Sequence, residues 1–248
     1  KIAGEFAPSI AIRTDDPEGC PAFYGRVVTG VANRPSPDWL QRRLTAIGQR
    51  PISLLVDITN YIMIDRARPL HVYDLATLKG ALVARKARAG ETVLALNGKS
   101  YVLDPTMTVI ADDVAVHDIG GIMGGEHSSV TEGTSDIVIE CAWFQPEAIG
   151  ATGRALGLAS DARSRFERGV DPAGLDDGLA LATQMVLDLA GGRASTAIRA
   201  GTPPMLDRSI AYDPALTLRL AGLAVAAERQ RDILSRLGFT VTGDMPWQ

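Results

Sequence analysis

The sequence is poor in the residues that build disulfides and metal centres: its 248 residues include two cysteines and three histidines. Cys20 and Cys141 lie far apart, without a CxxC motif or a Cys/His cluster. They therefore indicate buried thiols in a reducing compartment rather than a disulfide framework. His71, His117 and His127 lack the spacing of metal ligands, so the sequence predicts no metal site.

Long apolar runs are missing as well, since no stretch approaches the roughly 18 residues of a membrane-spanning helix. Charged residues make up 22% of the chain and hydrophobic residues 46%, which disfavours intrinsic disorder. The 25 basic and 29 acidic residues give a net charge of −4, which disfavours binding of nucleic acid through a broad basic surface. We expect no membrane and no DNA partner, although a local arginine cluster could still contact RNA phosphates.

The common signatures of catalysis are also missing. The chain has no GxSxG nucleophile elbow, no GxxxxGK[ST] phosphate loop and no HExxH zinc helix. It begins at Lys1 without a charged and then apolar leader, so we expect a piece of a longer protein rather than a secreted precursor.

What the sequence does contain is a series of strand patterns followed by helix patterns. Strand patterns cover residues 10–14, 23–31, 82–88, 92–96, 101–103, 107–111 and 136–141. Asn97-Gly98 predicts a hairpin turn, because both residues accept positive φ. Helix patterns cover residues 38–47, 52–66, 145–156, 161–168 and 172–190. This order favours an α+β fold with mixed or antiparallel sheets and packed helices.

Local signals also suggest where elements and domains begin and end. Ser36 and Pro37 predict the N-cap and first residue of the first helix. Pro203-Pro204 predicts a domain boundary near residues 203–208. We expect one domain over residues 1–205 and a smaller module over residues 206–248, with a strand at 209–212 and helices near 215–221 and 225–236.

The first candidate functional motif is DITNY at 57–61, followed by RPLH at 68–71. It places polar groups, Thr59 and Asn60 among them, in an apolar helix, and His71 just after a turn fixed by proline. The residues alone leave another interpretation open, in which Thr59 bonds back to a helical carbonyl and Asn60 faces solvent.

A second motif has four glycines within six positions, GGIMGG at 120–125. Such density permits close approach to the backbone. The amides around Gly120 and Gly121 could therefore meet a ligand, or the segment could be a bulged strand with a tight turn.

A third motif is the apolar run DIVIECAWF at 136–144, which Glu140 interrupts with a carboxyl group. A buried charge needs a partner. Glu140 therefore either pairs with a neighbouring donor as part of the structure or meets the hydrogen-bond donor of a ligand.

The last motif, SDARSRFERG at 160–169, predicts a short basic helix. Its arginines, Arg163, Arg165 and Arg168, could hold phosphates. They could equally form solvated pairs with Asp161 and Glu167.

Taken together, four segments of the chain resemble one family. They are DITNYIM…RPLHVYDL at 57–75, GGIMGGEHSSV at 120–130, IECAWFQP at 139–146 and SDARSRFERGVDP at 160–172. They are similar to the editing domain of the β subunit of bacterial phenylalanyl-tRNA synthetases, and the resemblance covers roughly residues 8–205. Residues 209–242 resemble the start of the next module of that subunit, a small α/β winged-helix-like domain that is cut short here.

The resemblance implies hydrolysis of tyrosine wrongly esterified to phenylalanine tRNA. This sequence matches the family's site at Thr59, Asn60, His71, Gly121, Glu140 and Ala162. It departs at Gly120, where many relatives carry alanine, and at Ser160, where threonine is common. These departures affect the expected width and specificity of the pocket more than its activity.

The resemblance also implies roles for these residues. Glu140, with Gly120, Gly121, Ser160 and Ala162, would bind the substrate, and its carboxylate would accept the phenolic proton of tyrosine. A phenylalanyl group would leave that acceptor unpaired.

His71, Thr59 and Asn60 are the expected catalytic residues. They would position the water or the ribose hydroxyls, because an aminoacyl ester is already activated. Arg163, Arg165 and Arg168 would bind the terminal nucleotides of the RNA.

The implied partners are phenylalanine tRNA and the α subunit, in a cytoplasmic heterotetramer. The intact enzyme would use ATP and magnesium, mainly on the other subunit, so we expect no cofactor in this chain and no aminoacylation by it. Two alternatives remain: an RNA-binding or subunit-assembly module without hydrolytic activity, and an amino-acid-binding domain.

Overall fold

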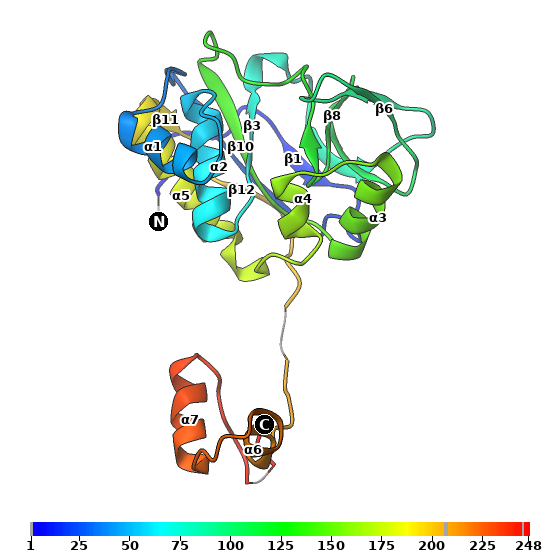
Figure 1. Ribbon diagram of the computed structural model, residues 1–248. Helices are drawn as coiled ribbons and strands as arrows, with labels where there is room; N and C mark the ends of the chain where they lie inside the picture. The colour runs from blue at the N-terminus through cyan, green and yellow to red at the C-terminus, as the bar shows by residue number, and fades with distance from the viewer. Residues whose placement is uncertain (1, 206–207, 245) are drawn as a thin grey trace. The chain divides into compact units, whose positions relative to one another are not determined.

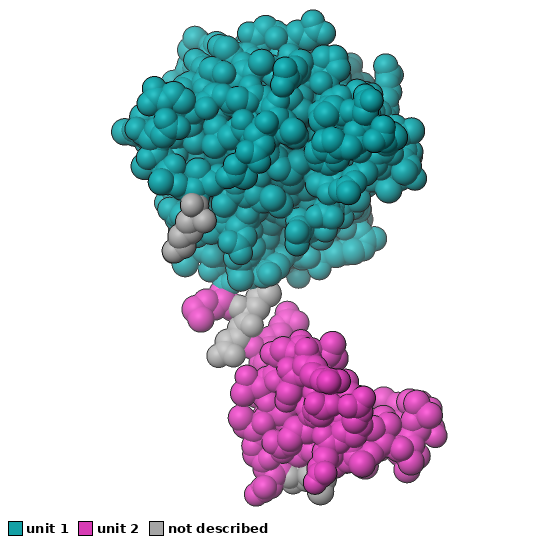
Figure 2. Space-filling model, turned by 90° about the vertical axis from the view of Figure 1, so that its left-hand side faces the viewer, with its two compact units in different colours: residues 1–204 teal, residues 205–248 magenta. Residues whose placement is uncertain are grey.

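A computed structural model describes residues 2–205, 208–244 and 246–248. The chain forms two compact units, Lys1–Pro204 and Met205–Gln248, each of which is described by itself (Figure 2). The second unit begins at Met205, one residue before the start expected from the sequence at residue 206.

The longest strands of the larger unit lie in one antiparallel sheet with the order β11-β2-β10-β3, in which β12 also pairs with β2 (Figure 1). The central strands β2 and β10 are almost entirely buried, which explains their near-continuous apolar sequence. The bounds are β2 (Ala22–Thr29), β3 (His71–Asp74), β10 (Asp136–Trp143), β11 (Arg193–Ala194) and β12 (Ile198–Gly201).

A second sheet has the order β1-β4-β7-β8-β9 and is mixed, because β1 and β4 run parallel while its other pairs are antiparallel. The separate hairpin β5-β6 confirms the turn predicted at Asn97-Gly98. Positive φ occurs there only at Gly98, where it is 74°. The bounds are β1 (Ile12–Thr14), β4 (Leu82–Lys86), β5 (Thr92–Leu94), β6 (Ser100–Val102), β7 (Thr108–Ala111), β8 (Val116–Ile119) and β9 (Met123–Gly124).

Helices cover the sheets, and α5 packs against both α2 and the central strands β2 and β10. None of the helices in the described ranges is both long and apolar enough to cross a bilayer. The α-helices of this unit are α1 (Asp38–Ala46), α2 (Leu54–Arg66), α3 (Pro146–Leu156), α4 (Asp161–Phe166) and α5 (Leu175–Ala190), with short 3-10 turns at Leu75–Thr77 and Pro172–Gly174.

This architecture confirms the expected α+β class with mixed and antiparallel sheets. The expected cap of α1 is wrong, because Pro37 occupies the N-cap position. Ser36 instead donates a hydrogen bond of 2.6 Å to the buried carboxylate of Asp57. The strands β3, β11 and β12 were not expected, since each is short and pairs with residues far away in sequence.

The described residues of the smaller unit form the helices α6 (Ala215–Ala221) and α7 (Ala227–Arg236). The strand expected at residues 209–212 is wrong, because only Tyr212 forms an isolated bridge, with Trp247. The buried Gln230 ties the unit together by accepting hydrogen bonds from the hydroxyls of Tyr212 and Thr217. The winged-helix-like character of this module stays a prediction.

Candidate functional site

A small pocket lies where β3 and β10 meet β8 and β9, with α4 alongside. Its volume is about 70 Å³, well below the roughly 300–1,000 Å³ of pockets that enclose drug-sized ligands. An aromatic ring can therefore enter only if lining side chains move. The lining residues are Pro69, Leu70, His71, Asp118, Ile119, Gly121, Ile122, Met123, Gly124, Glu140, Ala162 and Phe166.

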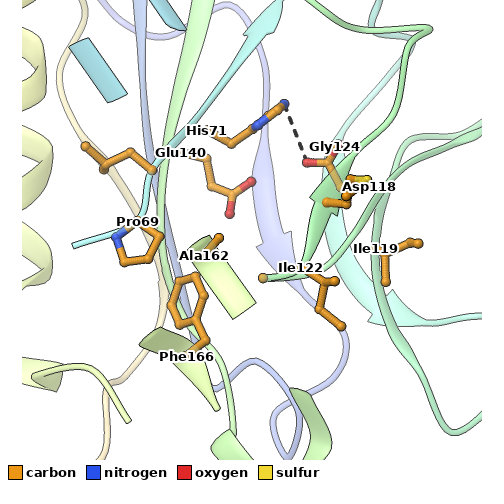
Figure 3. A pocket seen from close by; sticks show the side chains of 12 residues that line it. Pro69, His71, Asp118, Ile119, Ile122, Gly124, Glu140, Ala162 and Phe166 are labelled. Carbon is orange, nitrogen blue, oxygen red and sulfur yellow. Dashed lines mark ion pairs between the residues drawn. The ribbon is translucent and has the colours of Figure 1, made fainter. Parts of the chain in front are cut away.

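Strand pairing brings two of the predicted site residues together. His71 of β3 and Glu140 of β10 are register partners, and directly paired residues place their side chains on the same face of a sheet. Figure 3 shows the carboxyl group of Glu140 pointing into the pocket beneath His71, toward Ala162 and Ile122. Glu140 is buried, with 7% of its surface exposed.

Two further residues of this cluster, Tyr73 and Asp118, were not expected from the sequence. The hydroxyl of Tyr73 lies within hydrogen-bonding distance of Oε2 of Glu140 and Oδ2 of Asp118. Tyr73 itself has no exposed surface. Its place two residues after His71 is the pattern that could have found it, because alternate residues of a strand share a face.

The pKa of Glu140 is raised to about 8, first by burial and then by the negative charge of Asp118, while the hydrogen bond with Tyr73 acts to lower it. This upward shift favours the protonated carboxyl group over the ionised carboxylate expected from the sequence. Burial likewise raises the pKa of Tyr73 well above its ordinary value. The tyrosine therefore keeps its phenolic proton.

Asp118 connects this buried cluster to His71. Its Oδ2 lies 3.7 Å from Nε2 of His71, the contact drawn as a dashed line in Figure 3. Its Oδ1 accepts a hydrogen bond of 3.1 Å from the backbone N–H of Gly125. Nε2 of His71 is buried and has no hydrogen-bond partner among the described residues, so it retains hydrogen-bonding capacity for a ligand.

The glycine-rich segment forms the turn between β8 and β9. Gly121 has a φ of 68°, and a Cβ there would lie 2.8 Å from Cδ2 of Phe144. Gly120 donates its N–H to the carbonyl of Thr108 at 3.0 Å, and a Cβ on it would approach Phe144 to 3.0 Å. Both glycines therefore serve the tight turn, and Gly121 also lines the pocket.

Thr59 and Asn60 lie on α2 and are not among the described residues that line this pocket. The hydroxyl of Thr59 donates to the helical carbonyl of Val56 at 2.8 Å, which is the structural alternative left open by the sequence. Asn60 is half-buried. Their catalytic role stays a prediction.

Ser160 fixes the position of α4 beside the pocket. Its hydroxyl accepts from the N–H of Arg163 at 3.0 Å as the N-cap of α4, and it donates to the carbonyl of Ile122 at 2.7 Å. Ser160 thus supports the wall of the pocket, while Ala162 on the same helix lines it.

All three arginines predicted to bind RNA contact neighbouring groups, but they differ in exposure. Arg163 pairs with Glu167 at 3.0 Å, and its side chain is 17% exposed. Arg165 donates to the carbonyl of Met63 at 3.1 Å and is 23% exposed. Arg168 follows the end of α4, contacts the carbonyl of Ser164 and pairs with Glu167 at 3.5 Å, yet its side chain is 71% exposed. Its exposure makes Arg168 the most accessible of the three arginines to a partner.

The cavity beside these arginines has a volume of about 760 Å³. Its lining includes Arg66, Arg68, Arg165 and Arg168. In the described ranges no group of three or more His, Cys, Asp and Glu side chains is placed to hold a metal ion.

Comparison with known proteins identifies the family. Residues 19–191 match the B3/4 domain. The chain is 60% identical over 243 residues to the phenylalanine–tRNA ligase beta subunit of Novosphingobium aromaticivorans, and 56% identical over 237 residues to that of Zymomonas mobilis. These alignments cover 98% and 96% of this chain, which spans 30% of the length of each relative.

A crystal structure of an N-terminal fragment of the phenylalanyl-tRNA synthetase beta subunit from Pyrococcus horikoshii aligns with 99% of this chain and 70% of that one. Its sequence identity to this chain is 12% and the TM-score is 0.48. The match over residues 19–191 takes in most of the larger unit, including the whole pocket. The chain therefore belongs to the B3/4 domain family.

Proposed function

We propose that this chain is the editing region of a phenylalanine–tRNA ligase β subunit, which hydrolyses tyrosine esterified to phenylalanine tRNA. The observation that carries the proposal is the pairing of Glu140 with His71 at one pocket. Adjacent strands thus supply a carboxyl group that can hydrogen-bond to a phenol and an imidazole that can act at an ester. The identity to named β subunits supports the same assignment.

Recognition depends on the hydroxyl that distinguishes tyrosine from phenylalanine. Oε2 of Glu140 contacts Tyr73, whereas Oε1 accepts no hydrogen bond from any described residue. Oε1 can accept the phenolic proton of a tyrosyl group. A phenylalanyl ring would bury that oxygen unpaired, at a cost of about 1–3 kcal/mol, so the pocket selects for the hydroxyl.

Hydrolysis adds the oxygen of water to the ester carbonyl and breaks the bond to the ribose oxygen. The ribose oxygen takes up a proton, and the products are free tyrosine and a tRNA with a free terminal hydroxyl. Nε2 of His71 orients the water or a ribose hydroxyl. Thr59 and Asn60 assist from α2, and Gly121 gives the ester access to the backbone.

The intact protein, on this proposal, works in the cytoplasm with the α subunit as a heterotetramer. ATP and magnesium serve its aminoacylation centre, mainly on that other subunit. The present chain holds phenylalanine tRNA through Arg168 and its neighbours, and it does not charge tRNA by itself.

The decisive experiment is a deacylation assay of the 248-residue chain with tyrosyl- and phenylalanyl-tRNA. We expect tyrosyl-tRNA to be hydrolysed at least about tenfold faster, because the unpaired acceptor penalises phenylalanine by more than ~1.4 kcal/mol. Binding of tRNA without hydrolysis would instead favour the RNA-binding or assembly module.

A further inference from the structure

Tyr73 lies at the centre of a buried group of polar side chains. Its hydroxyl contacts Oδ2 of Asp118 and Oε2 of Glu140, and its ring packs edge-on against His71 with centroids 4.5 Å apart. Three of these residues, His71, Asp118 and Glu140, line the pocket, whereas Tyr73 lies behind them with no exposed surface.

The number of protons restricts how this group can be bonded. A phenol carries one proton, and an ionised carboxylate can only accept. If both carboxyl groups were ionised, Tyr73 could satisfy only one of them. Both contacts become hydrogen bonds when one carboxyl group is protonated and donates to the phenolic oxygen, while Tyr73 donates to the other.

The chemistry of the group identifies which carboxyl group holds the extra proton. The pKa of Glu140 is raised to about 8 by burial and by the charge of Asp118. Asp118 already serves as an acceptor, through its Oδ1, for the N–H of Gly125, and its Oδ2 lies 3.7 Å from Nε2 of His71. The arrangement that fits both contacts and the raised pKa of Glu140 has Oε2 of Glu140 donating to Tyr73 and Tyr73 donating to Asp118.

We propose that Tyr73 is a positioning residue that sets the preference for tyrosine, by holding Glu140 with Oε1 turned to the pocket and by linking it through Asp118 to His71. This inference rests on the proposed function and adds a residue that does not itself touch the substrate. Tyr73 fixes the rotamer of Glu140 and occupies its protonated oxygen, so the remaining oxygen is a pure acceptor. That oxygen can accept a hydrogen bond from the phenol of tyrosine, whereas the ring of phenylalanine would leave it without a donor.

The test compares Tyr73→Phe with the unmodified chain. The variant keeps the ring that packs on His71 and removes only the hydroxyl. Two readouts are measured: dissociation constants for L-tyrosinamide and L-phenylalaninamide, and deacylation rates for tyrosyl- and phenylalanyl-tRNA. We expect the preference for tyrosine to fall by roughly 3- to 10-fold in binding and in deacylation, which is the range of one hydrogen bond. The affinity for tyrosinamide should fall, while that for phenylalaninamide should stay the same.

Tyr24→Phe is the matched control, because Tyr24 is a buried tyrosine on β2, the other neighbour of β10, and does not line the pocket. It should leave both preferences unchanged. An unchanged preference in a folded Tyr73→Phe variant would overturn the inference, as would an unmodified chain that binds both amides equally. If the chain prefers tyrosinamide, and Tyr73→Phe reduces that preference while neither tRNA is deacylated, the positioning role stands and the proposed hydrolysis fails.

A measurement on the unmodified chain covers the case in which Tyr73→Phe does not fold. The buried hydroxyl proton of Tyr73 should give a slowly exchanging resonance in the NMR spectrum. Tyrosinamide should shift this resonance more than phenylalaninamide does, because the ligand hydroxyl bonds to the carboxyl group that contacts Tyr73. Equal shifts by the two amides would contradict the inference.

Discussion

Gly124 lies directly against the imidazole of His71: a Cβ added to Gly124 would come 2.6 Å from Cε1 of that ring. We therefore expect Gly124→Ala to displace His71 within an intact fold. Deacylation of tyrosyl- and phenylalanyl-tRNA should slow together by roughly tenfold, because misplacing a group that orients the reacting atoms costs rate without affecting recognition of the ring. The rates and the His71 Cε1–H resonance measure the effect.

Gly133→Ala is the control for this substitution, because the nearest atom to its added Cβ is 3.8 Å away, on Thr131. Its rates should equal those of the unmodified chain. A Gly124→Ala variant with normal rates and an unmoved imidazole resonance would show that His71 has room to adjust.

Much of the fold follows from local sequence, because the long elements carry strong periodic patterns. The seven buried positions of β2 and the hairpin at Gly98 are of this kind. The four-residue strand β3 is different, since it is defined by its pairing with β10, more than sixty residues away, and by a bridge to Ser129. No local pattern specifies such a partner.

The site shows the same division. Glu140 is conspicuous in an apolar run, and that alone indicates that it needs a partner. The identity of the partner, Tyr73, depends on the register of β3 against β10 and on the approach of β8, which supplies Asp118. The arginines at 163–168 are equally conspicuous, but sequence cannot tell the exposed Arg168 from the largely buried Arg163.

Arg168→Ala should weaken binding of phenylalanine tRNA. Its guanidinium group is exposed beside a cavity lined by other arginines, so its loss removes about one phosphate contact. Affinity measured across a salt series should show a slope smaller by roughly 1. Arg13→Ala is the control, because Arg13 is also exposed and also pairs with an acidic residue, Asp15. It should leave the slope unchanged, and an equal effect of both variants would point to nonspecific charge.

Residues 205–248 should open before the larger unit does. This unit is small and leaves Leu220 75% and Phe239 57% exposed, and a chain of about 40 residues seldom builds an independent core. Amides of α7 should exchange with solvent before those of α5 in native-state hydrogen exchange. Equal protection of the two helices would mean that the smaller unit has a stable core of its own.

Stability should fall as the pH rises, because of Glu140. Its folded-state pKa is raised from the ordinary 4.5 to about 8, so the folded form binds the proton more tightly. The stability that this provides is complete below about pH 4.5 and is lost as the pH rises toward 8, by up to ~1.4 kcal/mol per pH unit.

The titratable groups beside the carboxyl group of Glu140 are Tyr73, Asp118 and His71, and the thiols of Cys20 and Cys141 lie nearby.

Denaturant unfolding of the unmodified chain and of Glu140→Gln between pH 4.5 and 8.5 measures this effect. The amide of the variant does not titrate. As the pH rises, the free energy of unfolding of the unmodified chain should therefore fall relative to that of the variant. Parallel pH profiles would show that Glu140 has the same pKa in the folded and unfolded states.

Glu140→Ala and His71→Ala should separate recognition from chemistry, since the two residues are direct partners across β3 and β10 yet face different parts of the substrate. Removal of Glu140 deletes the acceptor for the tyrosyl hydroxyl and relieves the penalty for an apolar ring. Tyrosyl-tRNA deacylation should fall by ~10-fold, for a lost hydrogen bond of ~1.5 kcal/mol, and the difference from phenylalanyl-tRNA should narrow. Removal of His71 should slow both reactions and keep their ratio, because the imidazole acts at the ester.

The measurement is the deacylation rate of each tRNA, with the fold of both variants checked by circular dichroism. Glu140→Ala leaves the hydroxyl of Tyr73 with Asp118 alone, so some loss of stability is expected along with the loss of selectivity. Glu140→Gln keeps the size of the side chain and an acceptor oxygen, and it should retain more of the preference for tyrosine than Glu140→Ala does. If a folded Glu140→Ala variant keeps both its rate and its selectivity, Glu140 serves only the buried contacts with Tyr73, and the recognition of tyrosine must come from another part of the pocket.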